Sequence, residues 1–212
     1  HFGLELCAGD KDVWEQIDKS IASPIDATDN GVDIIKPIFD GIFPYSGAQT
    51  LLAHAPTWKE DESKMDEIFL EQVKKAAEIL SREIKVTTDN KEAEKLILNS
   101  YNKSPDKRLI ELTDSFPRYL YQETLSRLPE PIYLLYPGSN NTWKVEAVSK
   151  SPSTLESRKL FPQSWRGLMD GDAKLKEGTG VDDVIFCHRS GFLITAKSKE
   201  GALKLAQMAL LA

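Results

Sequence analysis

The feature that most constrains the fold is a change in hydrophobic periodicity near residue 108. Before it, apolar residues over 63–84 recur at helical spacing with charged residues on the opposite face, which predicts an amphipathic helix. Ser63 is its expected N-cap, with Asp66 three residues on, and a second helix is expected over 91–101. The apolar positions of the first helix are Met65, Phe69, Val73, Ala76, Leu80 and Ile84.

After residue 108 the pattern favours strands and one closing helix. Residues 137–141 (Pro-Gly-Ser-Asn-Asn) form a turn signal between two apolar runs, which predicts a hairpin. Strands are expected over residues 109–113, 132–136, 142–148, 184–187 and 192–195. Over residues 199–211, apolar residues lie on one stripe of a predicted helix that can pack on the sheet.

We therefore expect an α+β fold, in which a helical N-terminal half packs with a C-terminal lobe of mixed β-sheet and helix. The expected division is a mainly helical region over 1–107 and a lobe of β-sheet plus helix over 108–212. Residues 1–21 suit one or two short helices. Residues 35–57 carry Pro and Gly too often for a long helix, so loops and short turns are expected there.

Composition narrows the possible partners. The net charge of −6 over 212 residues gives no general attraction to a long duplex, so a phosphate ligand must be held by a local cluster of Arg and Lys. No apolar run approaches the roughly 20 residues that span a bilayer. Cys7 and Cys187 are far apart, which favours a reducing compartment. The first residues lack both Met and a secretion signal, so His1 is expected to follow a cut.

Asp26 and Asp29 are the candidate metal-binding residues. They lie in residues 25–31 (Ile-Asp-Ala-Thr-Asp-Asn-Gly), and carboxylate oxygens are the ligands that magnesium and manganese prefer. The alternative is a helix cap or a turn stabilised by an Asp side chain. Spacing alone favours the alternative.

Two C-terminal segments carry groups suited to a nucleotide. Arg158, Trp165 and Arg166 supply guanidinium groups and an aromatic ring, which bind phosphates and stack on bases. Alternatively, Trp165 fills the core and the arginines bind backbone carbonyls. Between two predicted strands, His188 can donate to a phosphate and Gly191 permits close backbone approach. A single histidine at a strand end is more often an ordinary polar residue.

Taken in order, six segments resemble the Myg-type exonuclease group. Its members are also described as metal-dependent protein hydrolases and are related to the DHH phosphoesterases, named for an Asp-His-His motif. The resemblance covers essentially the whole chain. The segments are residues 25–31, 55–58 (Ala-Pro-Thr-Trp), 157–158 (Ser-Arg), 165–168 (Trp-Arg-Gly-Leu), 188–192 (His-Arg-Ser-Gly-Phe) and 199–203 (Lys-Glu-Gly-Ala-Leu).

The resemblance implies a fragment of a DHH-phosphoesterase-like fold: the end of the phosphoesterase domain with connecting helices over 1–107, then a substrate-binding lobe. It implies a 3′ to 5′ exonuclease acting on single-stranded RNA or nucleotides with manganese or magnesium, in mitochondria and nucleus, the cytoplasm being possible. Asp26 corresponds to the last metal ligand and Asp29 is nearby. The residues implied in substrate binding are Arg158, Arg166, His188, Ser190 and Gly191.

The chain also departs from the family pattern. The family's Thr-His and Asp-His-His metal motifs lie upstream of the segment matching His1, so we expect this chain alone to be inactive, with no catalytic residue of its own. Ile194 and Thr195 stand in place of two glycines, and Ala53-His54-Ala55 replaces Arg-Leu-Asn. These departures favour the alternative function, a non-catalytic interaction or scaffold domain.

Overall fold

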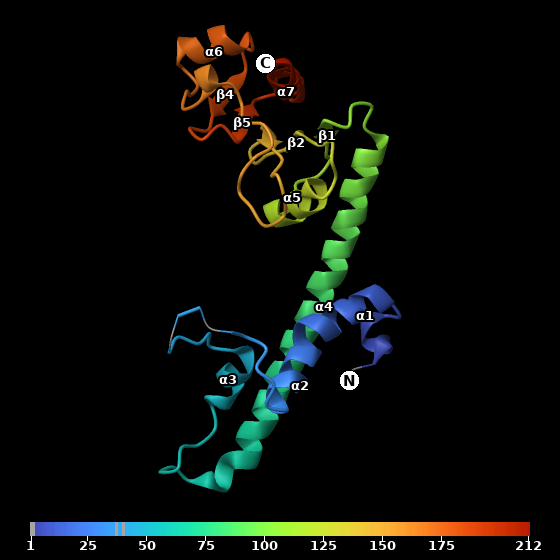
Figure 1. Ribbon diagram of the computed structural model, residues 1–212, viewed down its shortest axis with the longest axis vertical. Helices are drawn as coiled ribbons and strands as arrows, with labels where there is room; N and C mark the ends of the chain where they lie inside the picture. The colour runs from blue at the N-terminus through green and yellow to red at the C-terminus, as the bar shows by residue number, and fades with distance from the viewer. Residues whose placement is uncertain (1–2, 37, 40) are drawn as a thin grey trace. The chain divides into compact units, whose positions relative to one another are not determined.

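The computed structural model describes residues 3–36, 38–39 and 41–212. Their contacts divide the chain into two compact units, His1–Lys91 and Glu92–Ala212 (Figure 1). The expected boundary lay later, after residue 107, where helix gives way to strand. The intervening stretch belongs to the second unit because Ile97 and Tyr101 pack among apolar residues of that unit.

The helices described before residue 65 are all short. Short helices were expected over residues 1–21, and loops and short turns over residues 35–57. Asp10 caps the first α-helix by accepting hydrogen bonds from the N–H groups of Asp12 and Val13. The α-helices are α1 (Lys11–Ile17), α2 (Ser23–Asp29), α3 (Gly47–Leu52) and the beginning of α4 (Met65–Lys103). Shorter pieces are 3-10 helices at Leu4–Cys7 and Glu62–Lys64 and a π-helical turn at Asp18–Ala22.

The buried core of the first unit is small. It consists of Cys7, Val13 and Ile17, which pack with Leu80 and Ile84 of α4. The C-terminal end of the predicted apolar stripe on α4 thus faces a core. Its N-terminal end does not, because the side chains of Met65, Phe69 and Val73 are exposed.

The two helices expected over residues 63–84 and 91–101 are one continuous helix, α4. The prediction of a break was wrong because residues 85–90 contain no Gly or Pro, and Thr88 hydrogen-bonds back to the Ile84 carbonyl inside the helix. The predicted cap was also wrong. The N-cap is Asp61, whose carboxylate accepts the N–H of Ser63 at 2.9 Å. Asp61 caps the short 3-10 helix that precedes α4.

The second unit is built on a five-stranded mixed sheet in the order β1-β2-β3-β5-β4. β1 and β2 are parallel, and the other neighbouring pairs are antiparallel. All five strands were predicted, as was the β2–β3 hairpin. The strands are β1 (Leu109–Glu111), β2 (Tyr133–Pro137), β3 (Trp143–Ala147), β4 (Val184–Cys187) and β5 (Leu193–Ala196).

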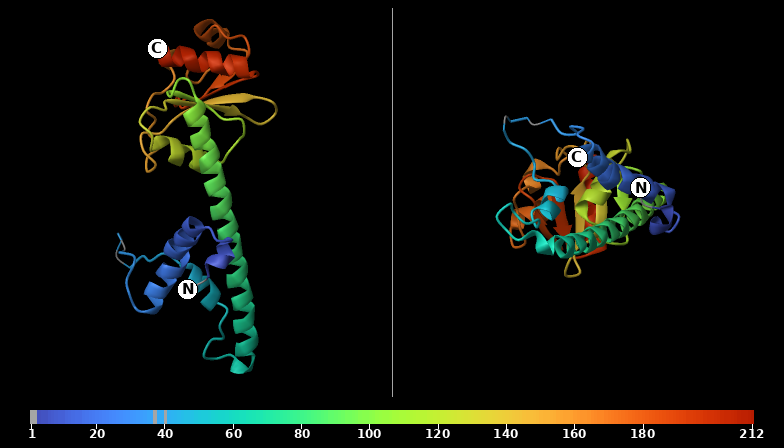
Figure 2. Two further views of the ribbon diagram at one scale, coloured as in Figure 1. Left: turned by 90° about the vertical axis from the view of Figure 1, so that its right-hand side faces the viewer. Right: turned by 90° about the horizontal axis from the view of Figure 1, so that it is seen from below.

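Helices cover the two faces of this sheet (Figure 2). On one face, α7 (Lys199–Leu211) and α6 (Ala173–Thr179) share an apolar core with β2, β3 and β5. On the other, α5 (Arg118–Ser126) and the end of α4 pack on β1 and β2. The α+β class is therefore confirmed. The predicted bounds of the closing helix are confirmed as well, and its buried stripe is Ala202, Leu205, Ala206 and Ala209.

Within the described residues, no helix is both long and apolar enough to cross a membrane. Both cysteines are free and buried. Burial raises the pKa of the Cys187 thiol to about 11, so this side chain behaves as a neutral core residue at ordinary pH.

Candidate functional site

The turn between β4 and β5 holds three of the predicted site residues. Gly191 adopts φ +74°, a conformation that favours glycine, and its N–H donates to the His188 carbonyl at 2.8 Å. His188 Nδ1 lies 2.7 Å from Ser190 Oγ and accepts the N–H of Ser190 at 3.2 Å. The turn thus presents an imidazole and a hydroxyl together on an exposed surface.

Arg166 joins this turn from a distant part of the chain. A Cβ on Gly191 would lie 2.4 Å from Arg166 Nε, so the guanidinium occupies the space that the glycine leaves open. Arg166 Nε also donates to the Phe161 carbonyl at 2.8 Å, and the Phe161 N–H donates to the Gly191 carbonyl at 2.8 Å. The structure therefore brings Arg166, His188, Ser190 and Gly191 together, and we call these four residues the turn site.

Arg158 makes different contacts. Its Nη1 and Nη2 donate to the carbonyls of Pro131 and Ser126 at 2.8 and 2.7 Å, and burial lowers the pKa of its guanidinium. Trp165 is buried and donates its indole N–H to the Gly178 carbonyl. These are the contacts expected from the structural alternative, whereas a phosphate contact by Arg158 stays a prediction.

Asp26 and Asp29 lie on the short helix α2, both exposed. Asn30 Nδ2 donates to the Asp26 carbonyl at 2.7 Å and lies 3.4 Å from Asp26 Oδ1, which fits a local helix-end role. Among the residues that the structure describes, no group of three or more His, Cys, Asp or Glu side chains is arranged to hold a metal ion. The two aspartates do not form a complete metal site by themselves.

The departures near the turn are packed into the sheet. Ile194 is fully buried in the core beneath α7. Thr195 is also buried, and its hydroxyl has no hydrogen-bond partner within the described part of the chain. Side chains therefore fill the backbone space that glycines would leave open at these two positions.

A buried carboxylate near the turn site was missed by the sequence analysis. Glu146, in the middle of β3, is only 2% exposed. Its Oε1 accepts from Arg118 Nε at 2.6 Å and from Gln122 Nε2 at 2.9 Å, while Oε2 accepts from Tyr121 and Tyr136 at 2.8 and 3.0 Å. Burial and the negative charge of Glu146 raise the pKa of both tyrosines, which keeps their hydroxyls protonated as donors.

The sequence contained one indirect sign of this cluster. Alternation in β3 places Val145 and Ala147 on one face and Glu146 on the other, and alternation alone does not say what covers that other face. Its neighbour across the sheet is Leu134, in a β2 run that is apolar at successive positions and so must be covered on both faces. That run indicated that the Glu146 face of β3 is covered too.

A surface hollow of about 430 Å³ lies elsewhere in the second unit, beside the end of α4. Its lining includes Lys103, Glu111 and Asp114 and none of the predicted site residues. Glu111 is paired with Lys199 at 2.6 Å, so charges of both signs meet at this surface. It offers no concentration of positive charge for a phosphate.

A family model and several known proteins match this chain. The family model MYG1_exonuc, described as an uncharacterised protein family (UPF0160), matches residues 8–210. The MYG1 protein of Schizosaccharomyces pombe is 28% identical over 93% of this chain and 63% of its own length. The human MYG1 exonuclease is 26% identical over 99% of this chain and 61% of its own length, and the bovine MYG1 exonuclease is 26% identical over 99% and 60%.

This chain thus spans about three fifths of the length of the curated relatives that it matches. No solved structure matches it. The expected DHH-phosphoesterase-like fold therefore stays a prediction. The family model, by contrast, matches residues 8–210, which is nearly all of the chain. The chain belongs to the MYG1 exonuclease family.

Proposed function

We propose that this chain is the substrate-binding part of a nuclease and holds single-stranded RNA at the turn site. The observation that carries the proposal is the meeting of Arg166, His188 and Ser190 around Gly191, from two segments far apart in the sequence. Guanidinium, imidazole and hydroxyl groups are phosphate donors. Relatives that bear the name MYG1 exonuclease support nucleic acid as the ligand class.

We expect hydrolysis only where the family's upstream metal-binding motifs are also present. The described residues of this chain provide only Asp26 and Asp29 toward the predicted manganese or magnesium centre. We expect negligible cleavage of RNA by the 212-residue chain. Mitochondrial and nuclear location stays a prediction from the family resemblance.

The test is fluorescence anisotropy of a labelled eight-nucleotide RNA titrated with the whole 212-residue chain. His188→Ala should weaken binding about fivefold, because one lost hydrogen bond is worth about 1 kcal/mol. His54→Ala is the matched control, since His54 is exposed in the first unit and its ring lies 3.5 Å from Lys75 Nζ. Equal affinity of wild type and both variants would refute the turn site, and absence of any binding would refute the substrate-holding role.

A second candidate is a non-catalytic interaction domain. The observation that favours it is the filling of the sheet by Ile194 and Thr195 where the family pattern has glycines. Under this alternative the double variant Ile194→Gly, Thr195→Gly would gain RNA affinity that the natural chain lacks. Unchanged affinity in a folded double variant would count against a loss of binding caused by these two residues.

A further inference from the structure

The ion pair of Glu146 and Arg118 is unusual in its placement. Removing a carboxylate from water is costly, and an apolar side chain of similar size in such a position is often neutral or stabilising. Here both oxygens of Glu146 are saturated by side-chain donors, so the charge is held in one geometry. A rigidly held buried charge can fix the position of its partner.

That partner reaches the surface. Arg118 begins α5, and its side chain is 42% exposed while that of Glu146 is 2% exposed. Glu146 engages Nε, one of several N–H donors of the planar guanidinium. The pair therefore joins a buried carboxylate to a guanidinium that is partly exposed to solvent.

The surface that Arg118 reaches is that of the turn site. Its guanidinium carbon lies 5.8 Å from the ring centre of Phe192, the residue after Gly191. On the same ring, His188 lies at 4.6 Å between ring centres. Phe192 thus lies close to two side chains of phosphate-binding type that come from different elements, the start of α5 and the β4–β5 turn.

The start of α5 adds to the positive character of this surface. Pro117 occupies the N-cap position and provides no side-chain hydrogen bond to the first N–H groups of the helix. Those groups carry partial positive charge, which favours a nearby anion. Arg118 and the N-terminal end of α5 thus both favour an anion at the same surface.

We propose that Arg118 binds a backbone phosphate of the single-stranded RNA held at the turn site, and that Glu146 is the positioning residue that fixes its guanidinium. This inference rests on the proposed function and extends the turn site across Phe192 to α5. A phosphodiester fits because it is an anion that accepts several hydrogen bonds from one guanidinium. A single strand fits because a net charge of −6 gives no general attraction to a long duplex.

The first experiment measures RNA affinity of the 212-residue chain as a function of salt. Arg118→Gln should weaken binding of the eight-nucleotide RNA roughly tenfold. It should also reduce the slope of log affinity against log salt by about 0.7, the value for one lost phosphate contact on a single strand. Arg127→Gln is the matched control, because Arg127 follows the same helix and pairs with Glu123 and Glu94.

The outcomes separate this inference from the proposed function. If His188→Ala weakens binding and Arg118→Gln matches Arg127→Gln in affinity and slope, the role of Arg118 is overturned and the turn site stands. If the wild-type chain binds no RNA, both fall together. Weaker binding in both His188→Ala and Arg118→Gln, with the reduced slope in Arg118→Gln and no change in Arg127→Gln, supports the extended site.

The second experiment tests the positioning role of Glu146 by asking whether Glu146→Gln raises or lowers the affinity for RNA. Glu146→Gln removes a negative charge, which on general electrostatic grounds strengthens binding to RNA. A positioning role predicts the opposite, a several-fold weaker affinity. Where Glu146→Gln fails to fold, Tyr136→Phe removes one hydrogen bond to Oε2 and should weaken binding about twofold to fivefold. Affinity equal to or above wild type in the folded variant overturns the positioning role.

Discussion

The two units differ in how they use apolar side chains. In the second, a sheet covered on both faces buries two sets of apolar residues. In the described part of the first, one small core is built around Cys7, Val13 and Ile17, while large apolar side chains such as Phe43 (69% exposed) and Trp58 (86% exposed) lie on the surface. Apolar content alone does not make a core, because each apolar face needs another element to pack on. Resistance to local unfolding should therefore be concentrated in the second unit.

The largest predicted effect is a core truncation in the second unit. Leu205→Ala should lower the free energy of unfolding of that unit by roughly 2–5 kcal/mol, since Leu205 is fully buried beneath the sheet. Leu52→Ala in the first unit should change the free energy of unfolding of the first unit by less than about 0.5 kcal/mol, because Leu52 is 69% exposed. Amide hydrogen exchange resolved by segment measures both. Similar losses of protection in the two variants would contradict the contrast between the units.

A smaller effect is expected from two glycines inside helices of the second unit. A Cβ on Gly201 of α7 would lie 2.0 Å from Asp183 Oδ1, and Asp183 is held by the N–H of Ser198. Gly201→Ala should therefore cost about 1–3 kcal/mol in unfolding free energy. On Gly178 of α6 the nearest atom would be Trp165 Cδ1 at 3.6 Å.

Gly178→Ala is thus the matched control for Gly201→Ala. It should be neutral or stabilise the unit by up to about 1 kcal/mol, because alanine favours the helical conformation over glycine. Thermal unfolding of the two variants, followed by circular dichroism, gives the comparison. A stabilised Gly201→Ala variant would mean that the contact with Asp183 does not restrict this position.

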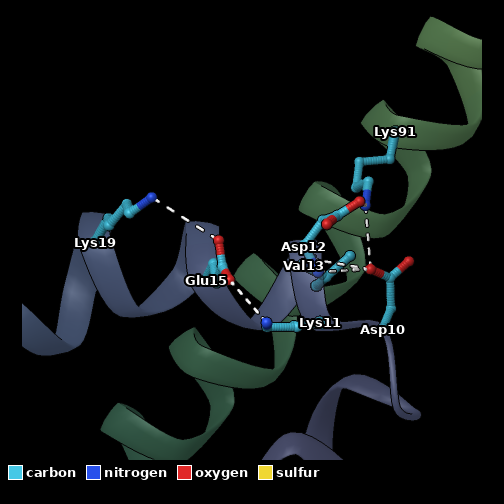
Figure 3. Close-up of polar contacts among 7 residues, drawn as sticks. All are labelled: Asp10, Lys11, Asp12, Val13, Glu15, Lys19 and Lys91. Atoms are coloured by element: carbon cyan, nitrogen blue, oxygen red, sulfur yellow. Dashed lines mark hydrogen bonds and ion pairs between the residues drawn. The ribbon is translucent and has the colours of Figure 1, made fainter.

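The smallest effect concerns charge in the first unit. Asp10 accepts backbone N–H groups at the start of α1 and pairs with Lys91 at 3.1 Å, while Asp12 pairs with Lys91 at 2.7 Å (Figure 3). The hydrogen bond from Val13 and then that from Lys91 lower the pKa of Asp10. A carboxylate whose pKa is lowered by folding stabilises the folded state at pH values above its unfolded-state pKa of about 3.9. This stabilisation is lost as the pH falls through the folded-state pKa.

Hydrogen exchange of α1 at a series of pH values should therefore show protection that decreases modestly below about pH 4. Asp10→Asn keeps an N-cap acceptor but not the charge, so protection by α1 should persist while its acid dependence becomes weaker. Asp10→Ala should reduce protection at every pH. Acid dependence that is identical in wild type and Asp10→Asn would assign the effect to another carboxylate.

Local patterns predicted most elements of the second unit. The bounds of α7 followed from a helical stripe that begins after Ser198, and the β2–β3 hairpin followed from the turn at residues 137–141. The break expected between residues 84 and 91 was wrong because weak helix formers such as Thr87 and Thr88 do not end a helix without Gly or Pro. The low helix propensity of these residues is outweighed by the continuous backbone hydrogen bonding of α4.

The candidate site was less accessible from the sequence. His188, Ser190 and Gly191 are neighbours in the chain, so their proximity was expected, but the approach of Arg166 to Gly191 depends on the fold. The burial of Glu146 was not predicted, because alternation describes one face of a strand and not what covers the other. Its four donors come from α5 and β2, a set that only tertiary packing assembles.

The buried carboxylate of β3 also has a consequence for anyone who engineers this protein. A redesign that optimises thermal stability would select an apolar residue at Glu146, together with phenylalanine in place of Tyr121 and Tyr136, since such exchanges of buried polar clusters are often stabilising. The same redesign would free Arg118 from its anchor. A library selected for heat resistance and one selected for ligand retention should therefore diverge at position 146, which makes this residue a direct indicator of what the natural sequence was selected to preserve.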